Sequence, residues 1–312
     1  MSGNEGNNTF WKEFHILAFS NYIEYQFVLF MGALVMYIFS MFGNLILIIV
    51  VILESQLHTP MYFFLCNLSV QDILYVSAIL PKLLAITVSE DTRIGFQCCI
   101  MQMFLFAFCV GTEFFLLTAM SYDRYVAICV PLHYALIMNK KMCFVLASIS
   151  WFLGALNSLM HSLIVANLSF CKSQEIDHVF CDVKTLLRMS CSETSDIHVL
   201  IYVEGIIFGL LPFFLIITSY VYIISRSILR IKSVQSRKKA FSTCTSHLTV
   251  LLMFYVTVLC TYMGPASEHS ERRDQIFSIL YTAVTPMLNP VVYSLRNNEV
   301  KGALKRILRL KK

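Results

Sequence analysis

A few ionisable side chains stand inside long apolar stretches, and their types and spacing indicate two kinds of chemistry. Asp72 and Glu113 are carboxylates in two different stretches. Glu113 and Arg124 are 11 residues apart, about three helical turns, so on one helix they share a face. Ionisable groups are expensive within a bilayer, and each therefore predicts a functional site. Carboxylate oxygens favour binding of a hard cation, and Asp123 beside Arg124 favours an ion pair.

The stretches that must position these groups are long enough to cross a membrane. Of the 312 residues, 57% are hydrophobic and only 14% are charged, whereas a soluble domain carries about 25% charge. A span needs about 20 apolar residues. Because lipid offers no hydrogen bonds, a single segment satisfies its backbone N–H and C=O groups by forming a helix. We therefore expect an all-α membrane protein, a seven-transmembrane helix bundle over residues 26–294. The predicted spans lie near residues 26–52, 60–82, 97–122, 142–166, 197–224, 242–263 and 275–294.

Charge and a glycosylation sequon predict the orientation of the bundle. With the amino terminus outside, sixteen of the 24 lysines and arginines fall on the inner side, as the positive-inside bias requires. The same orientation places the sequon at Asn7, in the polar tail 1–25, on the outside. No cleavable signal peptide is evident, so the first span serves as signal and anchor. We expect a multi-pass plasma-membrane protein, glycosylated at Asn7, with a cytoplasmic carboxyl terminus.

The carboxyl-terminal segment, residues 295–312, predicts a short amphipathic helix. Val300, Leu304, Ile307 and Leu308 share a helical face, and lysines and arginines occupy the rest. Such a helix lies on the anionic inner leaflet, with membrane lipid as its partner.

Three cysteines spaced ten residues apart, Cys171, Cys181 and Cys191, stand in a polar stretch and indicate disulfides. A candidate fourth partner opens the third span, where the cysteine is doubled as Cys98 and Cys99. Four cysteines allow three pairings, and spacing alone does not choose among them.

Four ordered motifs carry a resemblance that covers residues 20 to 305. They are Pro60–Leu65 followed by Asp72, Met120–Cys129 with Asp123-Arg124-Tyr125 at its centre, Lys239–Cys244 followed by His247, and Pro286–Pro290 followed by Tyr293. In this order and spacing, the chain resembles the vertebrate odorant (olfactory) receptors, within the rhodopsin-like G-protein-coupled receptors.

The resemblance implies a switch that couples a small-molecule odorant to a heterotrimeric stimulatory G protein, raising cyclic AMP. Arg124 would pair with Asp123 at rest and contact the G protein once freed. The implied switch residues are Asp123, Arg124, Tyr125, Tyr220, His247, Asn289, Pro290 and Tyr293. The resemblance also implies the disulfides Cys99–Cys181 and Cys171–Cys191.

The resemblance further supports a sodium site, the one cofactor expected here, made by Asp72, Glu113, Asn44 and Asn289. The alternative is a hydrogen-bonded polar core in which one carboxyl stays protonated, because two neighbouring carboxyls rarely both ionise without a cation. Both interpretations stay open at this point.

Helical spacing relative to these motifs predicts an apolar ligand cavity with a few polar groups. Its expected lining is Met103, Phe106, Val110, Glu204, Phe208, Tyr255, Val258, Tyr262 and Thr282. Helix–helix packing is the alternative role for each of them. Glu204 needs a partner in the membrane, and His161, near the end of the fourth span, is the predicted one.

Other functions receive less support from the sequence. Metalloprotease, serine-hydrolase and phosphate-loop motifs are absent, so no enzyme is expected. The net charge of +5 follows membrane orientation and predicts no nucleic-acid partner. A transporter or channel using the intramembrane carboxylates is the alternative function, although no inverted repeat is evident.

Overall fold

The structure of the chain is a computed structural model that describes residues 13–17, 25–89, 91–171, 173–227, 233–263, 275, 277–292 and 298–309. The sequon at Asn7 and the switch residue Tyr293 lie outside the described residues.

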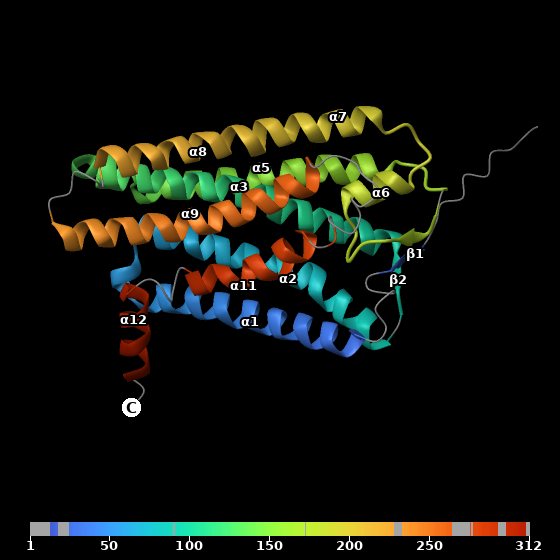
Figure 1. The fold of residues 1–312 in the computed structure, drawn as a ribbon, viewed down its shortest axis with the longest axis horizontal. Helices are drawn as coiled ribbons and strands as arrows, with labels where there is room; N and C mark the ends of the chain where they lie inside the picture. Colours follow the sequence, from blue (N-terminus) through green and yellow to red (C-terminus); the bar gives the residue numbers. More distant parts are fainter. Residues whose placement is uncertain are drawn as a thin grey trace, which may run out of the picture.

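Helices running along one common axis form a bundle of seven membrane-crossing segments in the described part of the chain (Figure 1). The first four are α1 (Gln26–Leu53), α2 (Pro60–Ser89), α3 (Phe96–Cys129) and α5 (Lys140–Ala166). The fifth combines α7 (Ser195–Glu204), the π-helical Gly205–Leu210, α8 (Leu211–Tyr222) and the π-helical Ile223–Ser227. The sixth is α9 (Val234–Tyr262), and the seventh combines the π-helical Leu280–Val284 with α11 (Thr285–Pro290).

Apolar length identifies five of these segments as membrane spans directly: α1, α2, α3, α5 and the stretch Ser195–Ser225. The apolar part of α9 is the shorter His247–Tyr262, and the seventh segment is described only over 277–292. The short connections at one end of the bundle include the 3₁₀ turns Ser55–Leu57 and Pro131–His133 and the helix α4 (Tyr134–Ile137). The predicted fold class, a seven-helix membrane bundle, is confirmed.

The fifth and seventh segments depart from the continuous helices that the sequence predicts. Two of the three named π-helical stretches end two residues before a proline, Gly205–Leu210 before Pro212 and Leu280–Val284 before Pro286. Proline has no amide hydrogen, so the carbonyl four residues earlier loses its usual donor and the helical turn widens.

Helix α3 is the centre of the bundle, and α5 packs closest against it. Gly111 of α3 faces Gly154 of α5, and a Cβ on Gly111 would lie 3.2 Å from the Gly154 Cα. A Cβ on Gly154 would lie 2.8 Å from the Thr112 amide nitrogen. Only glycine permits this approach of the two backbones.

A small three-stranded sheet, not anticipated from the sequence, covers one end of the bundle. Strand β1 (Glu13–Ile16) lies between β2 (Arg93–Gly95), which is antiparallel to it, and β3 (Glu175–Ile176), which is parallel. Phe14 is fully buried, with its ring centroid 5.5 Å from that of Phe170. The short helix α6 (Val183–Met189) lies at the same end, which we call the sheet end (Figure 1).

Helix α12 (Asn298–Arg309) lies at the opposite end and turns away from the bundle axis (Figure 1). Val300 and Ala303 are buried, and Arg306 bonds Glu54 and Gln56 beyond the end of α1. Leu304, on the predicted lipid-facing side, is 37% exposed, so Val300 and Ala303 face protein while Leu304 is available to lipid. The side chain of Leu308 lies outside the described residues.

The glycine contact between α3 and α5 generates a stability prediction. Gly154→Ala places a methyl group against the α3 backbone, and overpacking of this kind costs about 1–3 kcal/mol. We expect a lower thermal unfolding midpoint in detergent and reduced surface expression. Gly32→Ala is the matched control, because a Cβ at Gly32 meets nothing within 4 Å. Equal unfolding midpoints for the two variants would contradict the packing argument.

Candidate functional site

A cavity of about 370 Å³ opens inside the sheet-end half of the bundle. Its walls come from α3, α5, α7 with the following π-helical stretch, α9, and the loop before α6. The volume falls within the range of small-molecule sites, about 300–1,000 Å³. The lining is mainly aliphatic and aromatic, with polar groups from Asn157, His161, Asp182, Glu204 and Tyr262.

Seven of the nine predicted pocket residues line this cavity: Met103, Phe106, Val110, Glu204, Phe208, Val258 and Tyr262. Tyr255 and Thr282 do not line it. The buried Tyr255 ring packs 5.1 Å from both Phe114 and Phe213, so it lies below the cavity floor. Thr282 donates its hydroxyl to the Ser278 carbonyl within the seventh segment, which contributes no described residue to the lining.

Sequence reasoning missed the contribution of α5 and of the loop. Leu153, Asn157 and Met160 follow the spacing of one helical face on α5, a pattern that could have identified that wall. Asp182 gave no such signal, because its place in the cavity depends on how the loop folds.

His161 and Glu204 form the predicted ion pair, which joins α5 to α7. His161 Nε2 lies 3.1 Å from Glu204 Oε2, and both side chains are largely buried. His161 Nδ1 lies 2.9 Å from the Asn157 carbonyl oxygen, which can only accept, so Nδ1 carries a hydrogen. One further proton is therefore shared between Nε2 and the carboxylate.

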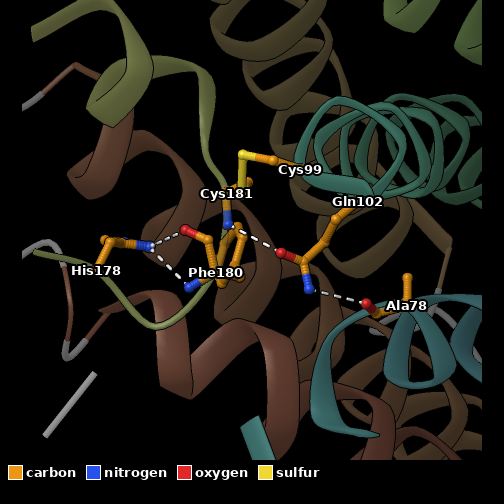
Figure 2. Close-up of a disulfide and its surroundings, with 6 residues drawn as sticks. All are labelled: Ala78, Cys99, Gln102, His178, Phe180 and Cys181. Carbon is orange, nitrogen blue, oxygen red and sulfur yellow. Dashed lines mark hydrogen bonds between the residues drawn. A yellow bond between two sulfur atoms is a disulfide. The ribbon is translucent and has the colours of Figure 1, made fainter. Parts of the chain in front are cut away.

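The loop that closes the cavity is held by the disulfide Cys99–Cys181 (Figure 2). The Cys181 amide donates to Gln102 Oε1 at 3.0 Å, while Gln102 Nε2 donates to the Ala78 carbonyl at 3.0 Å. Phe180 packs 4.7 Å from Phe106 of α3, measured between ring centroids. The neighbouring loop residues are thereby fixed over the cavity.

Asp182 follows that disulfide and turns into the cavity. Its Oδ1 accepts from the Tyr262 hydroxyl at 2.5 Å, and its Oδ2 accepts from the Lys184 amide at 3.1 Å. The Lys184 ammonium instead donates to the Thr261 carbonyl at 2.8 Å. Asp182 thus ties the loop to the end of α9.

The second disulfide, Cys171–Cys191, closes the loop on itself. Of the two adjacent cysteines that open the third span, Cys99 forms the disulfide with Cys181, whereas Cys98 is free and exposed. Both pairings implied by the resemblance are present.

The Asp123-Arg124-Tyr125 motif lies towards the opposite end of α3, in a closed arrangement. Arg124 pairs with Asp123, which is fully buried, and Asp123 Oδ1 also accepts from the Tyr134 hydroxyl at 2.7 Å. Burial and the Asp123 carboxylate raise the pKa of Tyr134, so this hydroxyl keeps its proton and remains a donor. Tyr125 packs near Tyr222, with ring centroids 6.2 Å apart.

The other implied switch residues join the fifth segment to the sixth and the seventh segment to the first. Tyr220 of α8 hydrogen-bonds His247 Nδ1 of α9, and both side chains are buried. Pro290 of α11 lies against Gly43, where a Cβ would approach the proline ring to 2.9 Å.

The predicted sodium residues lie between these two regions, and all four are buried. Asn289 Nδ2 donates to Asp72 Oδ2 at 2.9 Å, and Asn44 Nδ2 donates to the Pro286 carbonyl at 3.1 Å. Glu113 Oε2 accepts from Gln71 Nε2 at 3.2 Å. Five oxygens have no donor among the described residues: Asn44 Oδ1, Gln71 Oε1, Asp72 Oδ1, Glu113 Oε1 and Asn289 Oδ1.

These orphaned oxygens fit a hard monovalent cation. The described residues hold no group of three or more His, Cys, Asp or Glu side chains suited to a metal ion. Two carboxylates supplemented by amide oxygens suit hard cations rather than thiophilic transition metals.

A bundle of membrane-length apolar helices around an internal cavity of small-molecule size defines the class of the chain as a multi-pass α-helical membrane protein. The family model described as olfactory receptor matches residues 33–311. Olfactory receptor 1G1 of the gorilla is 47% identical, with 97% of each chain covered. Mouse olfactory receptor 1E16 is also 47% identical, over 97% of this chain and 96% of its own. Human olfactory receptor 1F1 is 44% identical over 99% and 98%. The chain belongs to the olfactory receptor family.

The doubled cysteine allows a direct test of the loop assignment. Cys99→Ser should remove the bridge to Cys181 and reduce surface expression, because a disulfide that closes a long loop contributes about 2–4 kcal/mol. Cys98→Ser, the adjacent control, should leave expression and unfolding unchanged. Peptide mapping without reductant measures the linkage, and a Cys98–Cys181 peptide would refute the assignment.

Proposed function

We propose that this protein is an odorant-type chemosensory receptor that binds small, largely apolar ligands in the 370 Å³ cavity and activates a stimulatory G protein, raising cyclic AMP. The observation that carries the proposal is that one helix, α3, contributes to both the cavity and the switch. One end of this helix lines the cavity with Met103, Phe106 and Val110, and the other end holds the closed Asp123–Arg124 pair.

An aromatic cluster provides the physical link between the two regions. Phe114 lines the cavity floor, and its ring centroid lies 4.8 Å from Phe254 and 5.1 Å from Tyr255 of α9. Farther along α9, His247 bonds Tyr220. A ligand that presses on Phe114 shifts α9, and this movement alters the Tyr220–His247 contact beside Arg124. The freed Arg124 then becomes available to the G protein.

The proposed orientation puts the sheet end outside the cell and α12 on the cytoplasmic face of the plasma membrane. Both disulfides lie at the sheet end, where an oxidising compartment suits them. Lys140, Lys141, Arg237 and the basic face of α12 lie at the other end, as the positive-inside bias predicts.

We also propose that sodium is held by the polar seam of Asp72, Glu113, Asn44 and Asn289. The five orphaned buried oxygens support this, since leaving such groups without a partner costs about 1–3 kcal/mol each. A bound cation would supply positive charge between the two carboxylates, so that both remain ionised.

Arg124→Ala tests the proposed coupling. We expect the receptor to reach the cell surface and to lose the ligand-dependent cyclic AMP response, because the freed guanidinium is the group offered to the G protein. Arg93→Ala is the control, since Arg93 is an exposed arginine at the sheet end, paired with Asp91. A full response from surface-expressed Arg124→Ala would refute the switch. Ligand-dependent current in membranes without G protein would favour a channel instead.

The sodium proposal predicts a salt-specific stability effect. Purified receptor should unfold at a higher temperature in sodium chloride than in choline chloride of equal ionic strength. The gain is about 2.7 kcal/mol when sodium is at 100 times its dissociation constant. Asp72→Asn should remove the difference, whereas Asp196→Asn, an exposed carboxylate change, should preserve it. Equal unfolding midpoints of the unmodified receptor in the two salts would contradict sodium binding.

A further inference from the structure

The polar groups of the cavity gather on one side of its lining. Asn157, His161, Asp182, Glu204 and Tyr262 come from the sheet-end parts of their helices and from the loop. Phe114, Phe115, Gly209 and Leu259 line the opposite, floor side. The cavity therefore suits a molecule with one polar head and an apolar body, its head towards the sheet end.

Acidic side chains predominate around that head. The described lining contains two carboxylates, Asp182 and Glu204, one histidine, and neither lysine nor arginine. Wherever the shared proton of the His161–Glu204 pair resides, the pair as a whole is neutral, so His161 offsets Glu204 and no basic side chain of the described lining offsets Asp182. An anionic head would meet both carboxylates with the already paired His161 as the one basic group of the described lining, which is costly in a site shielded from water.

One carboxylate oxygen of Glu204 is available to accept a hydrogen bond from a ligand. Glu204 Oε2 bonds His161, whereas Oε1 accepts no hydrogen bond from any described residue. Both Asp182 oxygens, by contrast, already accept hydrogen bonds, from Tyr262 and from the Lys184 amide. Within a membrane, a carboxylate oxygen without a donor is expensive, so a ligand N–H or O–H that reaches it gains more than it would in water.

We propose that the cavity selects small aliphatic amines, with Glu204 as the anchor of the ammonium head and Phe114 as the contact of the apolar tail. A protonated amine supplies both the donor that Oε1 lacks and a positive charge beside the two carboxylates of the described lining. His161 holds Oε2 and so orients the carboxylate towards the ligand. An alcohol supplies the donor alone, and a carboxylic acid supplies neither once it is ionised.

The length of the ligand follows from the fifth segment. Glu204 and Gly209 are five residues apart, at most roughly 7.5 Å along the axis, because the widened π-helical turns between them rise less per residue than an α-helix. A straight chain of about six carbon atoms spans this distance. This inference rests on the proposed ligand-binding function and adds the chemical class of the ligand.

The experiment compares hexylamine, hexanol and hexanoic acid, which share one carbon skeleton and differ only in the head. Binding is measured as thermal stabilisation of the purified full-length receptor, so it does not depend on G-protein coupling. Cyclic AMP in cells expressing the receptor is recorded in parallel. We expect hexylamine to bind at least about tenfold more tightly than hexanol, because charge-assisted hydrogen bonds are the stronger ones. Hexanoic acid should bind weakest.

Glu204→Gln keeps the shape of the side chain and removes its charge. It should weaken hexylamine binding by at least about tenfold and change hexanol binding by less than about threefold. Asp196→Asn is the matched control, since it removes an exposed carboxylate from the first turn of the same helix, away from the cavity. It should leave all three ligands unchanged. Surface expression and the unfolding midpoint without ligand establish that each variant is folded.

Several outcomes would overturn the assignment. Equal binding of the three ligands, or preference for the acid, would refute amine selection. An equal loss for amine and alcohol in Glu204→Gln would mean that Glu204 shapes the cavity without anchoring charge. Loss of amine preference in Asp182→Asn alone would move the anchor to Asp182.

The two readouts separate this inference from the proposed function. Amine binding without a cyclic AMP response would preserve the amine site and refute the proposed coupling. A cyclic AMP response to apolar odorants without amine binding would preserve the coupling and refute the amine site.

Discussion

A polar group inside a hydrocarbon layer must find its partner within the protein, and the arrangement of this bundle depends on that constraint. The described bonds between two polar side chains in the interior mostly join different helices: Asp72 to Asn289, Gln71 to Glu113, His161 to Glu204, Tyr220 to His247, and the Trp151 indole to Asn67. Each such bond contributes only about 0.6 kcal/mol on average in membrane proteins. The larger effect is the cost of breaking one, since water is not there to replace the lost partner.

The same constraint separates structural polar groups from those that support function. Trp151 and Asn67 satisfy each other, and nothing about them calls for a ligand. The seam around Asp72 and the edge of the cavity at Glu204 each retain acceptors without donors in the described structure. At these two places the acceptors belong to carboxylates and amides, and they support the proposals of a cation and of a ligand.

The sequence predicts the helices well because lipid imposes a single solution on an apolar stretch, and it predicts α3 best. Glu113 and Arg124 fall on the helix that the spacing requires, and Glu204 meets His161 as the cost of burial predicts. Tyr255 shows the limit of such reasoning. Helical periodicity assigns it the face shared by Val258 and Tyr262, but the large rings of Phe114 and Phe213 close the space around it. Periodicity identifies the face of a helix and does not show where a cavity ends.

Features that depend on irregular backbone were beyond the same reasoning. Strand β1 pairs with residues about 80 and 160 positions away, and four residues with so short a pattern carry no signal of their partners. Asp182 reaches the cavity because Cys181 is bound to Cys99 and Gln102, contacts that only the folded loop creates. Pro212 and Pro286 did mark helix irregularities, but a missing amide does not tell whether the helix kinks or widens.

The two sides of the cavity differ in stiffness, and this difference sets the direction in which a ligand can act. On the α3–α5 side, Gly111 and Gly154 bring two backbones together, and a close-packed backbone contact leaves no room to yield. On the other side, Gly205 faces the flexible tip of Met263 and Gly209 faces Leu259, both on the sixth segment or just beyond it. The π-helical backbone there also lacks the tight hydrogen bonding of an α-helix. A ligand larger than the resting cavity therefore displaces the fifth and sixth segments before the third and fourth. Those two segments carry Tyr220 and His247, so the compliant side of the cavity is also the side that bears on Arg124.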